Sequence, residues 1–104
     1  MPRYIVRLSD AGRDWYLEWS TVVDAPITYG ASLDEFREHY RSEYGEDGMR
    51  HLDERLRRVA ANGTSSQMGE SAEQLISGNR AGDDESELSM AAIIQKYCLS
   101  RPAD

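Results

Sequence analysis

The sequence predicts a small α+β domain in which an N-terminal antiparallel β-hairpin, with two to three strands in all, packs against three to four helices. Two observations lead to this prediction. Apolar and polar side chains alternate with a period of two through residues 4–20, and apolar side chains recur at helical spacing in later segments between residues 33 and 99. With 104 residues, of which 39% are hydrophobic, the chain can form one domain with one modest core.

The hairpin is expected from two strands at residues 4–9 and 15–20. The polar stretch between them, residues 9–14, contains Asp and Gly, which suit a tight turn between antiparallel strands. If Trp15 and Trp19 pack inward, the alternation turns the other side chains of the second strand outward. These outward side chains are Tyr16, Glu18 and Ser20.

A short third strand is expected at residues 27–29, at an edge of the sheet. Residues 24–26 mark the turn before it, because Pro26 donates no hydrogen bond and restricts the residue that precedes it. Gly30 closes the strand.

Two helices should follow. The first begins at Leu33 after a capping box from Ser32 to Glu35, and Gly45 stands where a left-handed residue would end it. Its apolar stripe consists of Leu33, Phe36, Tyr40 and Tyr44. The second helix has the stripe Met49, Leu52, Leu56, Val59 and Ala60 and ends at Asn62-Gly63. Its outer face carries Arg50, Arg55, Arg57 and Arg58, either as a solvated face or as a binding patch.

Residues 64–84 are rich in Gly and Ser and predict a long loop, either functional or flexible, with a short helix after a capping-box match that starts at Ser71. A last helix is expected at residues 87–99, ended by Pro102. Its apolar stripe consists of Met90, Ile93, Ile94, Tyr97 and Cys98.

The charge of the chain argues against direct binding of nucleic acid. The formal net charge is −7, from 19 acidic and 12 basic residues, and this charge repels a phosphate backbone at long range. The same sign suits a host protein with a basic surface, although an acidic surface also simply keeps many small proteins in solution.

The chain has no apolar run near the roughly 20 residues of a membrane span, and its N-terminus leads into a strand-like stretch rather than a signal peptide. We therefore expect a cytoplasmic protein with no membrane partner. The single cysteine, Cys98, excludes an intramolecular disulfide and agrees with a reducing compartment. Because a chain of this size gains stability from a dimer interface, a homodimer is a further expectation.

The sequence argues against an enzyme. The best metal candidates, Glu35, His39 and Glu43, recur along one side of one helix, with His51 elsewhere, whereas metal sites usually draw ligands from more than one element. The two histidines lie on predicted helix surfaces, and the common nucleophile, phosphate-loop, dinucleotide and zinc-protease motifs are missing from the sequence. We expect no metal, no cofactor and no catalytic residues.

Several segments remain as candidates for ligand or partner binding. The hairpin and its continuation, residues 15–30, offer outward aromatic and acidic side chains. Residues 63–66 and 78–82 offer hydroxyl, amide and guanidinium groups that suit an anion. Residues 83–85 form an acidic cluster. Helix caps and ordinary turns explain the same residues without a ligand. The candidates are Tyr16, Glu18, Asp24, Tyr29, Thr64, Ser65, Asn79, Arg80, Asp83, Asp84 and Glu85.

The stretch W-Y-L-E-W-S-T-V-V-D-A-P-I-T-Y-G at residues 15–30, with E-F at 35–36 and Y-R-S-E-Y-G at 40–45, resembles small proteins encoded by actinobacterial phages. The resemblance covers about the first half of the chain and implies a provenance rather than an activity. The basic residues agree with a high-GC source, since Lys96 is the one lysine among them. By analogy, small acidic phage proteins often inhibit bacterial defence.

These observations leave two hypotheses open. The first is a non-enzymatic phage accessory protein that inhibits a bacterial defence system, in the manner of an anti-CRISPR, by binding a host protein. The second is a sponge that binds and sequesters a signalling nucleotide, with aromatic side chains against the base and Arg80 or the helix arginines on phosphate. A small hydrolase is a distant third.

Overall fold

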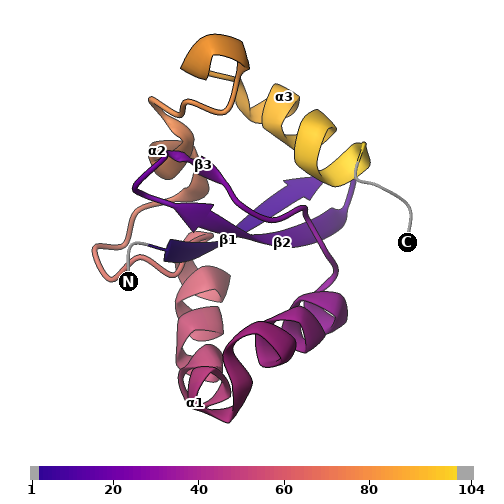
Figure 1. Cartoon of the computed structure of the whole chain (residues 1–104), viewed down its shortest axis with the longest axis vertical. Helices are drawn as coiled ribbons and strands as arrows, with labels where there is room; N and C mark the ends of the chain where they lie inside the picture. The colour runs from indigo at the N-terminus through magenta and orange to yellow at the C-terminus, as the bar shows by residue number, and fades with distance from the viewer. Residues whose placement is uncertain (1–2, 101–104) are drawn as a thin grey trace.

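The computed structural model describes residues 3–100, which form three layers with a small antiparallel sheet in the middle (Figure 1). The sheet has the strand order β1-β2-β3, and the long helix α1 covers one of its faces while α2 and α3 cover the other. The predicted α+β class is confirmed. The elements are β1 (Arg3–Asp10), β2 (Arg13–Ser20), β3 (Ala25–Pro26), α1 (Leu33–Asn62), α2 (Ala72–Ile76), η1 (Asp83–Glu85), α3 (Met90–Ile94) and η2 (Gln95–Leu99).

The predicted hairpin is confirmed. β1 and β2 pair in continuous antiparallel register from Arg3 opposite Ser20 to Asp10 opposite Arg13. Two residues make the turn, Ala11 with φ 51° and Gly12 with φ 78°. Positive φ at both central positions is the backbone that matches the twist of a two-residue hairpin, and glycine adopts it without steric cost.

The third strand lies two residues earlier than expected, and the prediction of residues 27–29 is wrong. Ala25–Pro26 pairs with the end of β2, with Pro26 opposite Trp19 at the sheet edge, where a missing N–H is tolerated. Beyond it the ladder is interrupted, because the amide of Glu18 donates to the side-chain Oγ1 of Thr28 at 2.9 Å instead of to a backbone carbonyl. Pairing resumes at Ala31, which exchanges two backbone hydrogen bonds with Tyr16.

The two predicted helices of residues 33–62 form one bent element, α1. The capping box at Ser32 is present, and Gly63 ends the helix with φ 90°, as expected. Between the two segments Gly45 has φ 67° and ψ −163°, which is non-helical, and the ribbon turns sharply there (Figure 1). The bend brings both segments of α1 against the same face of the sheet.

The segment after α1 contains the short helix that the sequence predicts. The capping box at Ser71 is present and starts α2, as expected. The last helix begins at Met90 after the cap residue Ser89, later than the predicted residue 87, and its final turn, Gln95–Leu99, has π-helical hydrogen bonding. The predicted end at Pro102 lies outside the described residues.

The sheet is buried on both faces, so residues 3–100 form two hydrophobic clusters. The cluster between the sheet and α2 and α3 is built on Val6, Leu8, Trp15, Leu17, Trp19, Ile76, Ile93, Ile94 and Cys98. The cluster under α1 is built on Ile5, Phe36, Tyr40, Leu52 and Val59. The expectation that Glu18 and Ser20 face outward is therefore wrong: Glu18 is 4% exposed and Ser20 is 8% exposed, because α1 covers the face opposite the tryptophans.

Among residues 3–100, no helix combines the length and the apolar content that a bilayer-spanning segment needs.

Candidate anion-binding cleft

Three arginines from two distant parts of the chain converge on one cavity. Arg3 is the first residue of β1, and Arg55 and Arg58 are three residues apart on the second segment of α1, so both lie on one side of that helix. The cavity has a volume of about 300 Å³. Its lining consists of Arg3, Tyr4, Arg55, Arg58, Ser65, Gln67 and Met68. We call this the arginine cavity.

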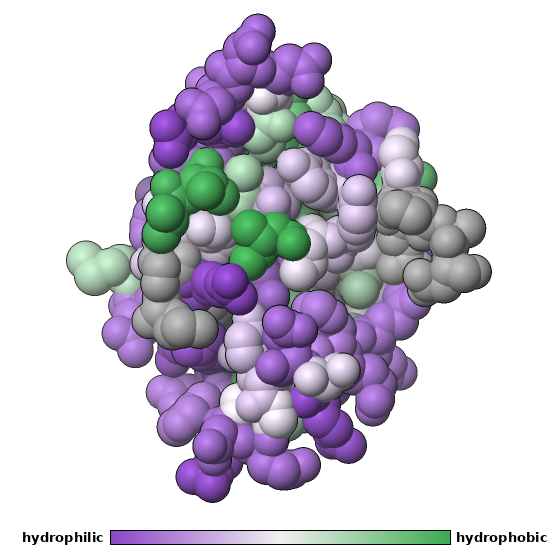
Figure 2. All heavy atoms as spheres, in the orientation of Figure 1, coloured by the Kyte–Doolittle hydropathy of each residue, from purple (hydrophilic) through white to green (hydrophobic). Residues whose placement is uncertain are grey.

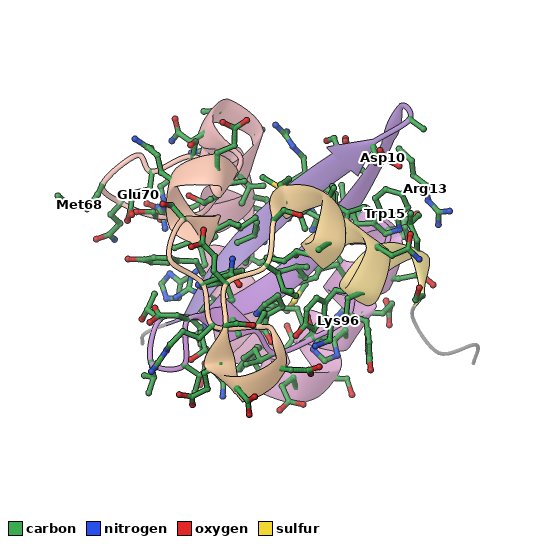
Figure 3. All side chains as sticks on the ribbon, turned by 90° about the horizontal axis from the view of Figure 1, so that it is seen from above. Asp10, Arg13, Trp15, Met68, Glu70 and Lys96 are labelled. Atoms are coloured by element: carbon green, nitrogen blue, oxygen red, sulfur yellow. The ribbon has the colours of Figure 1, made fainter. Side chains whose placement is uncertain are left out.

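The arginine cavity lies at the end of the sheet away from the hairpin turn. Figure 3 shows Met68 and Glu70 at one margin of the molecule and Arg13 and Trp15 at the opposite one. Met68 is 85% exposed and so stands at the mouth of the cavity rather than inside the core.

Neutral hydroxyls hold two of the three guanidinium groups. Arg3 Nη1 donates to the hydroxyl of Tyr44 at 2.8 Å, and Arg55 Nη1 donates to the hydroxyl of Tyr40 at 3.2 Å. These bonds orient the cations without neutralising them, so both keep their charge for an anion. The hydrogen bond to Tyr44 and the charges around it raise the pKa of Arg3 above its usual value.

Arg58 differs from Arg3 and Arg55 in that one of its two contacts is with a carboxylate. Its Nε donates to the backbone oxygen of Ser65 at 2.9 Å, and its Nη1 lies 3.3 Å from the carboxylate of Glu54. The first contact fixes the segment after α1 against the helix, and the second offsets part of the charge of Arg58. The hydrogen bonds of Arg3 and Arg55, by contrast, are made to neutral tyrosine hydroxyls.

A second cavity adjoins the first and shares Arg3 and Arg55 with it. It has a volume of about 250 Å³ and is lined by Arg3, Glu18, Tyr40, Tyr44, Asp47, Gly48 and Arg55. We call it the Glu18 cavity. The Oε1 atom of Glu18 accepts a 2.6 Å hydrogen bond from Tyr44, and the Nε2 atom of His39 lies 3.8 Å from Oε2.

Two tyrosines on α1 form the aromatic wall of the Glu18 cavity. The rings of Tyr40 and Tyr44 lie 4.6 Å apart between centroids. Burial raises the pKa of both phenols, with the hydrogen bond to Glu18 adding to the effect at Tyr44. Both therefore stay protonated at neutral pH. Gly48 packs against this wall, and a Cβ atom there would overlap the side chain of Tyr44.

The arginine cavity and the Glu18 cavity together form the candidate cleft. Of the predicted candidates, Glu18 lines the Glu18 cavity and Ser65 lines the arginine cavity. Tyr16 is half-buried, with its ring 6.2 Å from that of Phe36. Thr64 and Ser65 are buried: the Thr64 hydroxyl donates to the backbone oxygen of Glu70, and the Ser65 hydroxyl accepts from the amide of Ile5. Both hydroxyls thus hold the segment after α1 in place.

The other candidates lie on the far side of the sheet. Asn79 is buried and makes four hydrogen bonds to backbone atoms, so it organises the loop. Arg80 bridges two carboxylates, those of Asp24 at 3.6 Å and Glu85 at 3.7 Å. Asp83 and Asp84 are exposed beside Glu85 on η1, and Tyr29 is about half exposed against Tyr97.

A separate apolar surface lies at the turn between β2 and β3. Val22, Val23 and Ile27 are exposed there, Val22 by 65%. Figure 2 shows hydrophobic side chains on this side of the molecule with hydrophilic ones around them. Arg80 connects this turn to η1, because its two carboxylate partners, Asp24 and Glu85, lie one in each segment.

Sequence reasoning did not single out Arg3, Tyr40 and Tyr44 as binding residues. It places the two tyrosines in the apolar stripe of a helix, where their rings do lie, but it does not show that their hydroxyls meet Arg3 of β1 and Arg55 of the second segment of α1. The arginines of the second helix were noted as an alternative binding patch, and Arg55 and Arg58 now belong to a cavity while Arg57 is exposed.

The described residues contain no group of three or more His, Cys, Asp or Glu side chains that could hold a metal ion. Of the metal candidates, Glu35 accepts from the amide of Ser32 in the capping box, and His39 lies beside Glu18 and the ring of Phe36. Compared with known protein families, with curated proteins and with solved structures, the chain shows no significant match.

Proposed function

We propose that the protein binds and sequesters a small phosphorylated ligand, of the class of signalling nucleotides, without chemical conversion. One observation carries the proposal: Arg3, Arg55 and Arg58 line a single cavity in a protein whose net charge is −7. Guanidinium groups bind phosphate oxygens with charge-assisted, often bidentate hydrogen bonds. A local cluster of such groups in an acidic chain is the arrangement that a site for a small anion requires.

The overall charge favours a small anion over a polymer. A nucleic acid that approached the arginine cavity would bring other phosphates close to the acidic remainder of the surface. A mononucleotide or dinucleotide is small enough to interact with the electrostatic field of the cavity arginines alone. A volume of about 300 Å³ is at the lower end of the range of small-molecule sites. For a protein encoded by a phage, such binding would remove a nucleotide signal on which host defence depends.

Calorimetric titration of the full chain with pyrophosphate and with nucleoside diphosphates tests the proposal. We expect binding that weakens as salt increases, and a loss of about tenfold or more in affinity in Arg55→Gln, because one charge-assisted hydrogen bond contributes about 1.5–3 kcal/mol. Arg57→Gln is the matched control, since Arg57 lies on the same helix but outside the cavity. Absence of binding and of thermal stabilisation at millimolar concentrations of all these ligands would contradict the proposal.

A second candidate function is inhibition of a host defence protein through the turn between β2 and β3. The exposed Val22, Val23 and Ile27 lie next to η1, whose Asp83, Asp84 and Glu85 are all exposed. An apolar centre with an acidic margin suits a protein partner with a basic surface.

Binding of a purified defence protein at increasing salt tests this second candidate. We expect affinity to fall with salt and to fall further in the triple variant Asp83→Asn, Asp84→Asn and Glu85→Gln. The matched control neutralises three exposed carboxylates of α1, with Glu38→Gln, Glu43→Gln and Glu46→Gln. Equal affinity in all three proteins at every salt concentration would argue against this surface.

A further inference from the structure

Glu18 is a buried carboxylate at a place where packing alone requires no charge. It lies in the middle of β2, between the sheet and α1, and is 4% exposed. Transfer of a carboxylate from water to such a position is unfavourable, and even a buried ion pair can often be replaced by apolar residues without loss of stability. The stability of the fold therefore does not explain why an acidic residue occupies position 18.

A chain of hydrogen bonds fixes the orientation of this carboxylate. Arg3 donates to the hydroxyl of Tyr44, and Tyr44 donates to Oε1 of Glu18. The other oxygen, Oε2, lies 3.8 Å from Nε2 of His39, beyond hydrogen-bond distance. An ionised carboxylate only accepts hydrogen bonds, so the group that Glu18 can recognise in its cavity is one that carries N–H or O–H donors.

The surroundings of Glu18 suit an aromatic ring that is joined to a phosphate. The rings of Tyr40 and Tyr44 line the Glu18 cavity, and aromatic side chains are the usual contacts of a nucleobase. Arg3 and Arg55 line both cavities, so the two are adjacent. A ligand with its phosphates in the arginine cavity can place its base in the Glu18 cavity.

We propose, on the basis of the proposed function, that the Glu18 cavity receives the base of the nucleotide and that this base is guanine. Guanine carries two neighbouring N–H donors on one edge, the ring N1–H and the 2-amino group, and these match an acceptor-only carboxylate. Adenine and cytosine place an acceptor nitrogen beside their amino group, and this lone pair would face the negative charge of Glu18. Uracil has one N–H between two carbonyl oxygens, which would repel the carboxylate in the same way.

Titration of the full chain with guanosine diphosphate, inosine diphosphate and pyrophosphate tests the assignment. The two nucleotides differ only in the 2-amino group of guanine. We expect guanosine diphosphate to bind at least about tenfold more tightly than inosine diphosphate, as for the loss of one hydrogen bond to a charged group. In Glu18→Gln this ratio should fall below about twofold, because the amide carries no charge and replaces one of the two acceptor oxygens by an N–H donor, while pyrophosphate should bind no more weakly than to the wild type.

Two further variants keep the outcome interpretable. Tyr44→Phe retains the aromatic wall but removes the hydrogen bond that positions Glu18, and it should reduce the guanosine preference even if Glu18→Gln does not fold. Arg57→Gln, outside both cavities, should keep the full preference. Equal affinity of the wild type for the two nucleotides, with pyrophosphate bound, would overturn the guanine assignment and leave the proposed function intact. Failure of pyrophosphate and of both nucleotides to bind would overturn both.

Discussion

The hydroxyl of Tyr44 donates a 2.6 Å hydrogen bond to Oε1 of Glu18, and this bond joins the first segment of α1 to the central strand β2. It supplies the buried carboxylate with a donor from the helix that covers it. The bond thus belongs both to the packing of α1 on the sheet and to the wall of the Glu18 cavity.

Tyr44→Phe should therefore lower the free energy of unfolding. The substitution removes the donor but keeps the ring, so Glu18 loses a hydrogen bond that burial makes difficult to replace with water. We expect a loss of about 1–3 kcal/mol in urea denaturation. Tyr29→Phe is the matched control, because Tyr29 is about half exposed, and it should change stability by less than about 0.5 kcal/mol. Equal stability of the two variants would show that the hydrogen bond from Tyr44 to Glu18 makes no net contribution to the free energy of unfolding.

Stability should also fall at alkaline pH. Burial raises the pKa of Tyr40 and Tyr44 above the usual value of about 10, so the folded state holds their protons more tightly than the unfolded chain does. The resulting stability is fully present below the unfolded pKa and is lost as pH rises through the folded pKa. Urea denaturation between about pH 8 and 11 should show this decline. In Tyr40→Phe/Tyr44→Phe the decline should be weaker, and an identical decline would contradict the assignment.

The local elements could be predicted from the sequence because their signals lie within a few residues of one another. Short residue spacings predict the capping boxes at Ser32 and Ser71 and the helix end at Gly63. All three features are present in the structure. The third strand could not be placed in this way. The regular ladder is interrupted at Thr28, whose hydroxyl accepts from the Glu18 amide ten residues away in the chain.

The candidate site could not be assembled from the sequence, because it joins residues that are far apart in the chain. Arg3 meets Tyr44, 41 residues later, only after α1 has folded back over the sheet. The outward orientation of Glu18 was predicted on the assumption of a sheet with one buried face. That assumption fails because the two segments of α1 cover the second face, and the number of covered faces is a property of the tertiary fold.

Asn79→Ala should destabilise the protein strongly although Asn79 lies in a loop. Its Nδ2 donates to the backbone oxygens of Ile76 and Leu88, and its Oδ1 accepts from the amides of Ala81 and Leu88. Removal of the side chain takes these partners from the amide and the backbone oxygen of Leu88 and from the buried amide of Ala81, so we expect a loss of about 3 kcal/mol in the free energy of unfolding. Asn62→Ala, at an exposed position, should cost less than about 0.5 kcal/mol. Similar losses in both variants would refute this role of Asn79.

The two glycines at positive φ in the hairpin turn and in the α1 bend should respond differently to substitution. Gly12, with φ 78°, lies in a two-residue hairpin turn with open space around it, a setting in which asparagine is common, so Gly12→Asn should cost less than about 1 kcal/mol. Gly45 combines φ 67° with ψ −163°, a backbone region that is essentially restricted to glycine. Gly45→Asn should therefore cost about 1–3 kcal/mol in urea denaturation, or straighten α1.

The Gly45 substitution should also affect the cleft, because the bend of α1 lets both helix segments contact the same face of the sheet. The first segment supplies Tyr40 and Tyr44 and the second supplies Arg55, so a straighter helix would separate the tyrosines from the arginine that binds one of them. Gly45→Asn should thus reduce the affinity for pyrophosphate as well as the stability, whereas Gly12→Asn should leave that affinity unchanged. Full pyrophosphate affinity in a destabilised Gly45→Asn protein would show that the bend stabilises the fold without shaping the site.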